Sequence, residues 1–297
     1  MSDFWKNKNV LFIGDSITAS KEYPKVIEES LGINVFYHCK SGADIVSMVD
    51  GERGLSGIYN ELSDFEGILR PLTADSVRNM DLIVFFGGYN NILYGGYNGN
   101  NCFPGNPGDL YNPDGTGQDT LAGIMQYAIE RIYEELARAK NTTCRILIVT
   151  VDCAGKNKWI NVDGCSEIEP NSGKSYKNYA CVQKAVAEIN LIPCCDLFHT
   201  SGINKHTWCC FGAESESFDP HYTMYPLNEA GEILSNEFIK YEHGKYYYQI
   251  RNNGVILEQY NEHVPYPYNR DQLHKSSAGY QRIGEVILGA IISAYGI

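Results

Sequence analysis

Five short apolar runs constrain the fold of this chain more than any other feature of its sequence. The runs lie at residues 10–13, 33–37, 82–86, 146–151 and 191–198. Each has the length of a strand, and their lack of polar alternation indicates strands that are buried on both faces. Such strands belong to a mainly parallel sheet with helices on both sides, so we expect an α/β fold.

Segments of helical period lie between and after these runs. Apolar residues within 23–31, 121–139 and 278–296 recur at the spacing of one helix face. We expect these helices to cover the sheet, and we expect the last of them to be a closing helix that packs against it.

Three stretches do not fit this alternation, and we interpret them as insertions into a single domain that spans residues 1–297. They lie at about 90–117, 153–175 and 199–269. Within the last, residues 245–260 read KYYYQIRNNGVILEQY, and two β-prone runs around Asn-Asn-Gly predict a β-hairpin. Its tyrosines suit a sugar-binding groove, a contact with a second copy of the chain, or the small core of the insertion itself.

Polar and glycine residues follow the first three strand-like runs. They are Gly14, Asp15 and Ser16 after the first run, Gly42 after the second, and Gly88, Asn90 and Asn91 after the third. Because the carboxyl ends of parallel strands meet at one edge of a sheet, we expect these residues to lie close together. Gly14 permits a tight turn, which would leave Ser16 at the tip of the first strand.

These residue types are the components of acyl-transfer chemistry. If the Ser16 hydroxyl attacks a carbonyl carbon, the backbone N–H groups of Ser16 and Gly42 and the Asn90 amide could form an oxyanion hole. Each residue also has a structural interpretation. Asp15 and Ser16 are common helix caps, Gly42 is a common turn residue, and Asn90 suits an Asx turn.

A base for such a serine is available just before the closing helix. Asp271 and His274 lie three residues apart, so in a turn both side chains can face the same way. His274 could offer Nε2 to Ser16 while Asp271 steadies Nδ1. The structural alternative is a helix cap. We expect no acid in the same relation to the other histidines, which are His38, His199, His206, His221, His243 and His263.

Together these motifs resemble those of the SGNH or GDSL hydrolases. The blocks are GDSIT with Ser16, a glycine after the second strand, Gly88-Tyr89-Asn90, and Asp271-Gln272-Leu273-His274. The resemblance implies a flavodoxin-like three-layer α/β/α sandwich with a five-stranded sheet. It also implies Ser16 as nucleophile, His274 as general base, Asp271 as its orienting acid, and no metal or organic cofactor.

The resemblance further implies an oxyanion hole from Ser16, Gly42 and Asn90, with Asp15, Gly88 and Asn91 in supporting positions. The chain departs from the family pattern at Asn91, where an aspartate is common, and in the length of the segment before Asp271.

The charge balance disfavours nucleic acid as a partner. The formal net charge is −12 with a pI near 5.0, and no dense Lys/Arg cluster occurs. The first ten residues lack the apolar stretch of a signal peptide, and no segment reaches the roughly 18 apolar residues of a membrane span. We therefore expect a soluble protein made in the cytoplasm that does not bind membranes. Its final location, including a virion or cell-surface assembly, is left open.

Two cysteine pairs raise the question of a metal site. Cys194-Cys195 and Cys209-Cys210 have His199 and His206 between them, and thiolates and imidazoles are usual zinc ligands. Neither pair has the spacing of a zinc knuckle, so we expect no metal.

The sequence thus predicts a serine esterase, and most specifically one that removes acetyl groups from a carbohydrate. Two alternatives remain at this point. One is a glycan-binding or structural module without catalysis, which could assemble through the 199–269 insertion. The other is a lipase or thioesterase that uses the same triad.

Overall fold

The chain divides into two compact units in the computed structural model. One comprises Met1–Gly212 with Leu273–Ile297, and the other comprises Ala213–Gln272. The residues that the structure describes are 4–51, 69–94, 102–111, 119–154, 175–204, 207–212, 223–225, 240–242, 245–252, 255–260 and 273–296. The second unit falls largely within the predicted 199–269 insertion, and the single-domain interpretation stays a prediction.

A five-stranded parallel sheet forms the centre of the first unit, as the apolar runs predict. Its strands are β1 (Asn9–Gly14), β2 (Asn34–Cys39), β3 (Leu82–Phe86), β4 (Arg145–Val149) and β5 (Cys194–Cys195). The spatial order is β2-β1-β3-β4-β5, which is the flavodoxin-like order. Every residue of β3 is buried, because helices cover both faces of the sheet.

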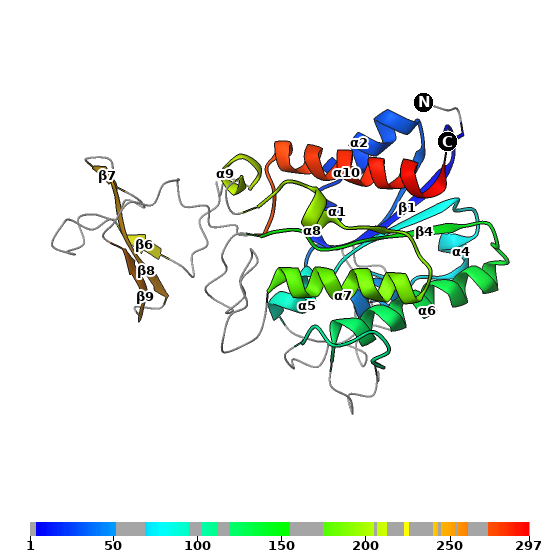
Figure 1. Ribbon diagram of the computed structural model, residues 1–297, viewed down its shortest axis with the longest axis horizontal. Helices are drawn as coiled ribbons and strands as arrows, with labels where there is room; N and C mark the ends of the chain where they lie inside the picture. Colours follow the sequence, from blue (N-terminus) through cyan, green and yellow to red (C-terminus); the bar gives the residue numbers. More distant parts are fainter. Residues whose placement is uncertain are drawn as a thin grey trace. The chain divides into compact units, whose positions relative to one another are not determined.

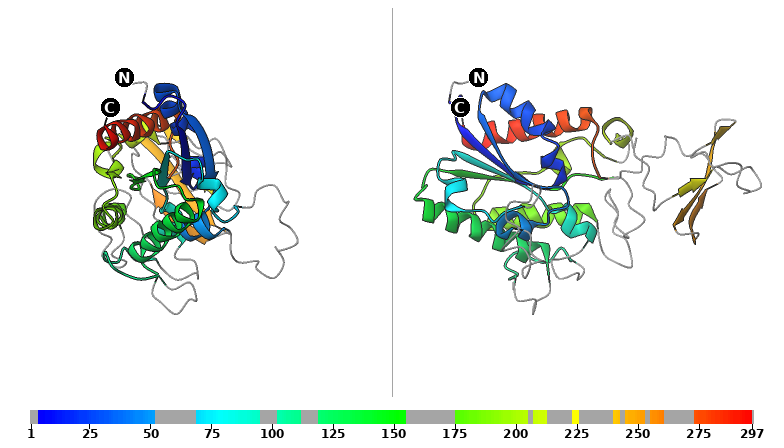
Figure 2. Two further views of the ribbon diagram at one scale, coloured as in Figure 1. Left: turned by 90° about the vertical axis from the view of Figure 1, so that its right-hand side faces the viewer. Right: turned by 180° about the vertical axis from the view of Figure 1, so that it is seen from behind.

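The helices form the two outer layers of this unit. They are α1 (Ser16–Ala19), α2 (Glu22–Leu31), α3 (Ile45–Asp50), α4 (Ala74–Val77), α5 (Tyr89–Tyr94), α6 (Leu121–Ala139), α7 (Tyr176–Ile189), α8 (Leu197–Thr200), α9 (Trp208–Phe211) and α10 (Ser277–Tyr295). Figure 1 shows α2 and α10 on one face of the sheet and α6 and α7 on the other, and the view from behind in Figure 2 shows the same layers. The predicted three-layer α/β/α fold is confirmed.

Two boundaries differ from the sequence prediction. The fifth run was expected to be a strand over 191–198, but β5 spans Cys194–Cys195 and is followed by α8. The strand ends there because the Asp196 side chain caps α8 by accepting from the His199 N–H. Asn90, predicted to open a long loop, lies within α5.

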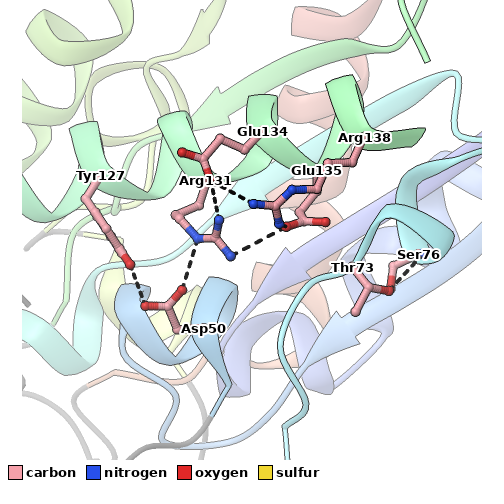
Figure 3. A network of polar contacts seen from close by, with 8 residues as sticks. All are labelled: Asp50, Thr73, Ser76, Tyr127, Arg131, Glu134, Glu135 and Arg138. Atoms are coloured by element: carbon pink, nitrogen blue, oxygen red, sulfur yellow. Dashed lines mark hydrogen bonds and ion pairs between the residues drawn. The ribbon is translucent and has the colours of Figure 1, made fainter. Parts of the chain in front are cut away.

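A polar network joins α3 to α6 (Figure 3). Asp50, the last residue of α3, accepts from the Tyr127 hydroxyl at 2.7 Å and from Arg131 Nε at 3.2 Å. Arg131 also contacts Glu134 and Glu135 along α6, and Arg138 contacts Glu135. Because α3 follows the loop that contains Gly42, this network anchors one end of that loop to the helical layer.

Among the described residues of the second unit, the structure has the antiparallel strands β6 (Thr223–Tyr225), β7 (Lys240–Glu242), β8 (Lys245–Asn252) and β9 (Val255–Tyr260). β8 pairs with each of the other three. The predicted hairpin is confirmed, since β8 and β9 pair in antiparallel register around residues 253–254.

Much of the predicted insertion at 153–175, and parts of those at 90–117 and 199–269, lie outside the described residues. Within the part of the chain that the structure describes, none of the helices has the length and apolarity that a membrane span requires.

Candidate active site

Ser16 lies two residues after the last residue of β1 and is the first residue of α1. Gly14 ends the strand where the backbone has no room for a side chain: a Cβ there would lie 2.0 Å from Thr18 Oγ1 and 2.6 Å from the Phe86 carbonyl oxygen. Close approach of β3, rather than a left-handed backbone, therefore requires glycine at this position. The result is a half-buried Ser16 at the carboxyl edge of the sheet.

His274 meets Ser16 at this edge. The distance between His274 Nε2 and Ser16 Oγ is 2.7 Å, although the two residues are 258 positions apart in the chain. His274 is half-buried and lies three residues before Ser277, the first residue of α10. Asp271, the predicted orienting acid, lies outside the described residues, so its place beside His274 stays a prediction.

Asp15 caps α1 from a fully buried position. Its Oδ1 accepts from the Ile17 N–H at 3.0 Å, while Oδ2 is buried without a hydrogen-bond partner in the described part of the chain. Burial raises the pKa of Asp15 from 3.8 to about 7, against the opposing effects of the Ile17 N–H and of His274 and Lys275. The charge of the Asp15 carboxyl group therefore changes near neutral pH.

The loop after β2 meets α5 beside the predicted oxyanion residues. Asn90 is buried, and its amide donates to the Ala43 carbonyl at 2.9 Å, next to Gly42 in the chain. Gly42 is exposed and has a φ of 82°, a left-handed conformation that favours glycine. Gly42 and Asn90 are thus brought together through Ala43.

Asn91 keeps one hydrogen bond that an aspartate could also make. Its side chain is fully buried, and Oδ1 accepts from the Ile45 N–H at 3.0 Å. A carboxylate could accept the same bond, so the departure from the family pattern preserves an acceptor at this point. The bond ties α5 to the start of α3.

Gly88 is held in place by a residue that the sequence analysis missed. Gln183 of α7 is buried, and it donates to the Gly87 carbonyl and accepts from the Val151 N–H, each at 2.7 Å. A Cβ on Gly88 would lie 2.9 Å from Gln183 Nε2, and the φ of Gly88 is 122°. A glutamine on a helix gives no sequence signal of this role.

Tyr89, Asp152 and Lys275 form a second group that the sequence analysis missed. Lys275 Nζ is 3.1 Å from Asp152 Oδ1, and the Tyr89 hydroxyl donates to the same carboxyl oxygen. Burial raises the pKa of Asp152, although the Lys275 charge opposes this. Asp152 follows the fourth apolar run, so the strand-tip argument applied to that run would have found it.

The expectation that no other histidine has a comparable acid was wrong for His199. Asp196 stands three residues before it, and His199 Nδ1 lies 2.8 Å from Asp196 Oδ1. Although partial burial opposes it, hydrogen bonds from Lys184 and His199 lower the pKa of Asp196. This second Asp-x-x-His lies on α8, with the His199 side chain 44% exposed.

The two cysteines of β5 are packed as thiols at the edge of the core. Burial raises the pKa of both Cys194 and Cys195 to about 12, which disfavours the thiolate form that binds metal. His206 and the side chain of Cys209 lie outside the described residues, so the expected lack of a metal stays a prediction.

A solved structure with a TM-score above 0.5 supports the fold. A structure of a protein from Lactobacillus plantarum matches with a TM-score of 0.53 and 14% identity, over 98% of this chain and 99% of that one. A variant of an acetyl-xylooligosaccharide esterase from Geobacillus matches with a TM-score of 0.46 and 12% identity, over 98% and 96%. A GDSL-like lipase from Bacteroides thetaiotaomicron matches with a TM-score of 0.39 and 16% identity, over 97% and 89%.

No protein-family model and no curated protein sequence matches the chain. The likeness to the solved structures is one of fold at low sequence identity. The resemblance to the SGNH and GDSL hydrolases therefore rests on the sequence motifs described above.

Proposed function

We propose that this chain is a serine esterase with an SGNH-type site, in which Ser16 is the nucleophile and His274 the general base. The observation that carries the proposal is the 2.7 Å separation of His274 Nε2 and Ser16 Oγ. A serine hydroxyl within hydrogen-bond reach of an imidazole has the geometry of an activated nucleophile. Its location at the carboxyl edge of a parallel sheet, where open α/β folds bind ligands, adds support.

The proposed reaction proceeds in two halves. Ser16 Oγ attacks the ester carbonyl carbon as its proton passes to His274 Nε2, and the oxyanion is held by the N–H groups of Ser16 and Gly42 and by the Asn90 amide. The tetrahedral intermediate then collapses, and the leaving alcohol takes the proton from His274. Water gives a proton to His274 and attacks the acyl-Ser16 carbonyl. The bond to Ser16 Oγ then breaks, His274 returns the proton to Ser16 Oγ, and the carboxylic acid is released.

For the substrate we propose an O-acetyl group on a carbohydrate. Four tyrosines lie within residues 245–260, and aromatic side chains suit sugar rings. The sequence also has no long apolar stretch that could serve as a lid over a fatty acyl tail. A lipase or thioesterase would use the same catalytic residues and would differ in the pocket for the acyl chain.

The test is acetate release from 4-nitrophenyl acetate and from a panel of acetylated glycans. Ser16→Ala and His274→Ala are each expected to lower kcat by at least about a thousandfold. Two matched controls are available in the chain: Ser20→Ala removes an exposed hydroxyl at the end of α1, and His199→Ala removes the histidine of the second Asp-x-x-His. Both controls are expected to keep the wild-type rate.

The outcomes separate the candidate functions. Faster turnover of long-chain esters or thioesters than of acetylated glycans would replace the carbohydrate assignment while keeping the serine mechanism. A wild-type protein that turns over none of these esters, and whose Ser16 does not react with a fluorophosphonate, would indicate a glycan-binding or structural module. Light scattering of the same preparations would test whether copies associate through the 199–269 insertion.

A further inference from the structure

Lys275, the residue after His274, has a buried side chain whose ammonium group contacts three other groups. Its side chain is 0% exposed, which is rare for lysine. Nζ lies 3.1 Å from Asp152 Oδ1 and 2.6 Å from the Leu273 carbonyl oxygen, and it sits 5.8 Å from the centre of the Tyr89 ring. A buried charged group is stable in a folded protein only when it is paired and hydrogen-bonded.

These contacts constrain the backbone of His274 from both sides. The side chain of Lys275 turns back to the carbonyl of Leu273, so it closes a short loop around His274. The Lys275 backbone pairs with Gly212, and the next residue donates its N–H to the Phe211 carbonyl at 2.8 Å. The residue after His274 is therefore fixed both to Asp152, three residues after β4, and to Gly212, directly after α9.

The Asp152 carboxyl group also contacts Tyr89, the residue before Asn90. The Tyr89 hydroxyl donates to Asp152 Oδ1 and accepts from the Asp152 N–H at 2.8 Å. Tyr89 is fully buried and directly precedes Asn90 in α5. One buried network thus connects the neighbour of the proposed base with the neighbour of a proposed oxyanion donor.

We infer that Lys275 is a positioning residue. Through its contacts with Asp152 and Tyr89, it keeps His274 next to Ser16 and keeps Asn90 in its position at the site. The inference rests on the proposed function of the site. Lys275 has no role in the chemistry itself, so its loss should lower the rate at each intact active site and leave substrate affinity nearly unchanged.

The main test is Lys275→Met, with active sites counted by titration with a fluorophosphonate. We expect kcat per titrated site for 4-nitrophenyl acetate to fall about 10- to 100-fold, with KM changed less than about threefold. Lys184→Met is the matched control, because Lys184 pairs with Asp196 at 2.9 Å but is 57% exposed. A folded Lys275→Met protein with kcat per site within about twofold of wild type would overturn the inference.

Milder variants cover the case in which Lys275→Met does not fold. Tyr89→Phe removes one hydroxyl from the network, and the double variant Lys275→Met with Asp152→Asn removes both charges. Either is expected to lower kcat per titrated site about three- to tenfold, whereas Tyr133→Phe, which removes the hydroxyl of an exposed tyrosine on α6, is the unaffected control. Wild-type rates in both network variants would contradict the inference.

A crystal structure of a folded network variant separates this inference from the proposed function. If wild type lacks esterase activity, the proposed function fails, but the separation of His274 Nε2 and Ser16 Oγ can still be compared. A separation above about 3.5 Å in the variant supports positioning by Lys275. A separation that stays at 2.7 Å overturns it.

Discussion

Replacing Asp15 by asparagine tests how much stability the protein loses by burying a carboxyl group beside Ser16. Asparagine has nearly the same shape, and its Oδ1 can accept the bond from the Ile17 N–H that caps α1. It cannot ionise. The difference between the two proteins therefore isolates the effect of the Asp15 charge.

The size and sign of this effect follow from the two protonation equilibria. Burial raises the pKa of Asp15 from 3.8 to about 7, so the folded protein holds this proton more tightly than the unfolded chain does. The contribution of this proton to the free energy of unfolding is fully present below about pH 4 and is lost as the pH rises from about 4 to 7. Above about pH 7 the contribution changes no further. A shift of about three pKa units, at about 1.4 kcal/mol each, corresponds to a loss of about 4 kcal/mol in the free energy of unfolding over this pH range.

Urea unfolding at a series of pH values measures this directly. The free energy of unfolding of Asp15→Asn is expected to equal that of wild type near pH 4. Its advantage should grow by about 1.4 kcal/mol per pH unit and level off at about 4 kcal/mol above pH 7. Titrating groups that do not interact with Asp15 affect both proteins alike, so their contributions cancel in the difference.

The control is Asp44→Asn, which makes the same exchange at the N-cap of α3, where the aspartate is only partly buried. It shows how much the free energy of unfolding depends on pH when an aspartate that is only partly buried is replaced by asparagine. If the advantage of Asp15→Asn over wild type is the same at pH 5 as at pH 8, the reasoning from burial is refuted.

Two further substitutions test the supports of the site. Gln183→Leu leaves the Gly87 carbonyl and the Val151 N–H buried without a partner, so it is expected to lower the free energy of unfolding by about 2 to 4 kcal/mol; unchanged urea unfolding would contradict this. Asn91→Ala leaves the Ile45 N–H unpaired and is expected to cost about 1 to 3 kcal/mol by the same assay, with a lower kcat because α5 also carries Asn90; full stability and wild-type kcat would show that this bond does not support the site.

The sheet could be predicted because its strands are buried on both faces. The β3 strand begins and ends at the predicted residues, and so does α6, whose apolar residues recur at helical spacing. The fifth strand was predicted too long because an apolar run does not distinguish a strand from a buried helix start. Asp196, inside that run, is the cap that begins α8.

The sequence suggested the candidate residues Ser16, Asn90 and His274 because they follow strand tips or form short motifs, and the structure brings Ser16 and His274 together. Motif spacing alone was not sufficient, because Asp196 and His199 have the same spacing on α8 and His199 is exposed. The supports from Gln183 and Lys275 could not be predicted, since each joins segments that are far apart in the chain. A lysine is also seldom expected in a core.

We expect the buried charge of Asp15 to lower the stability of the folded protein and to raise kcat. Lys275 is paired with Asp152 in its own network, whereas Asp15 is a buried carboxyl whose ionisation is favoured by nearby positive charge on His274. Acyl transfer would make His274 an imidazolium, and opposite charges attract more strongly in a buried site than in water. An ionised Asp15 would then stabilise that imidazolium. Asp15→Asn is therefore expected to gain stability near pH 8 and to lose kcat there, a trade-off common at active sites. A variant that is both more stable and as fast as wild type would refute this coupling.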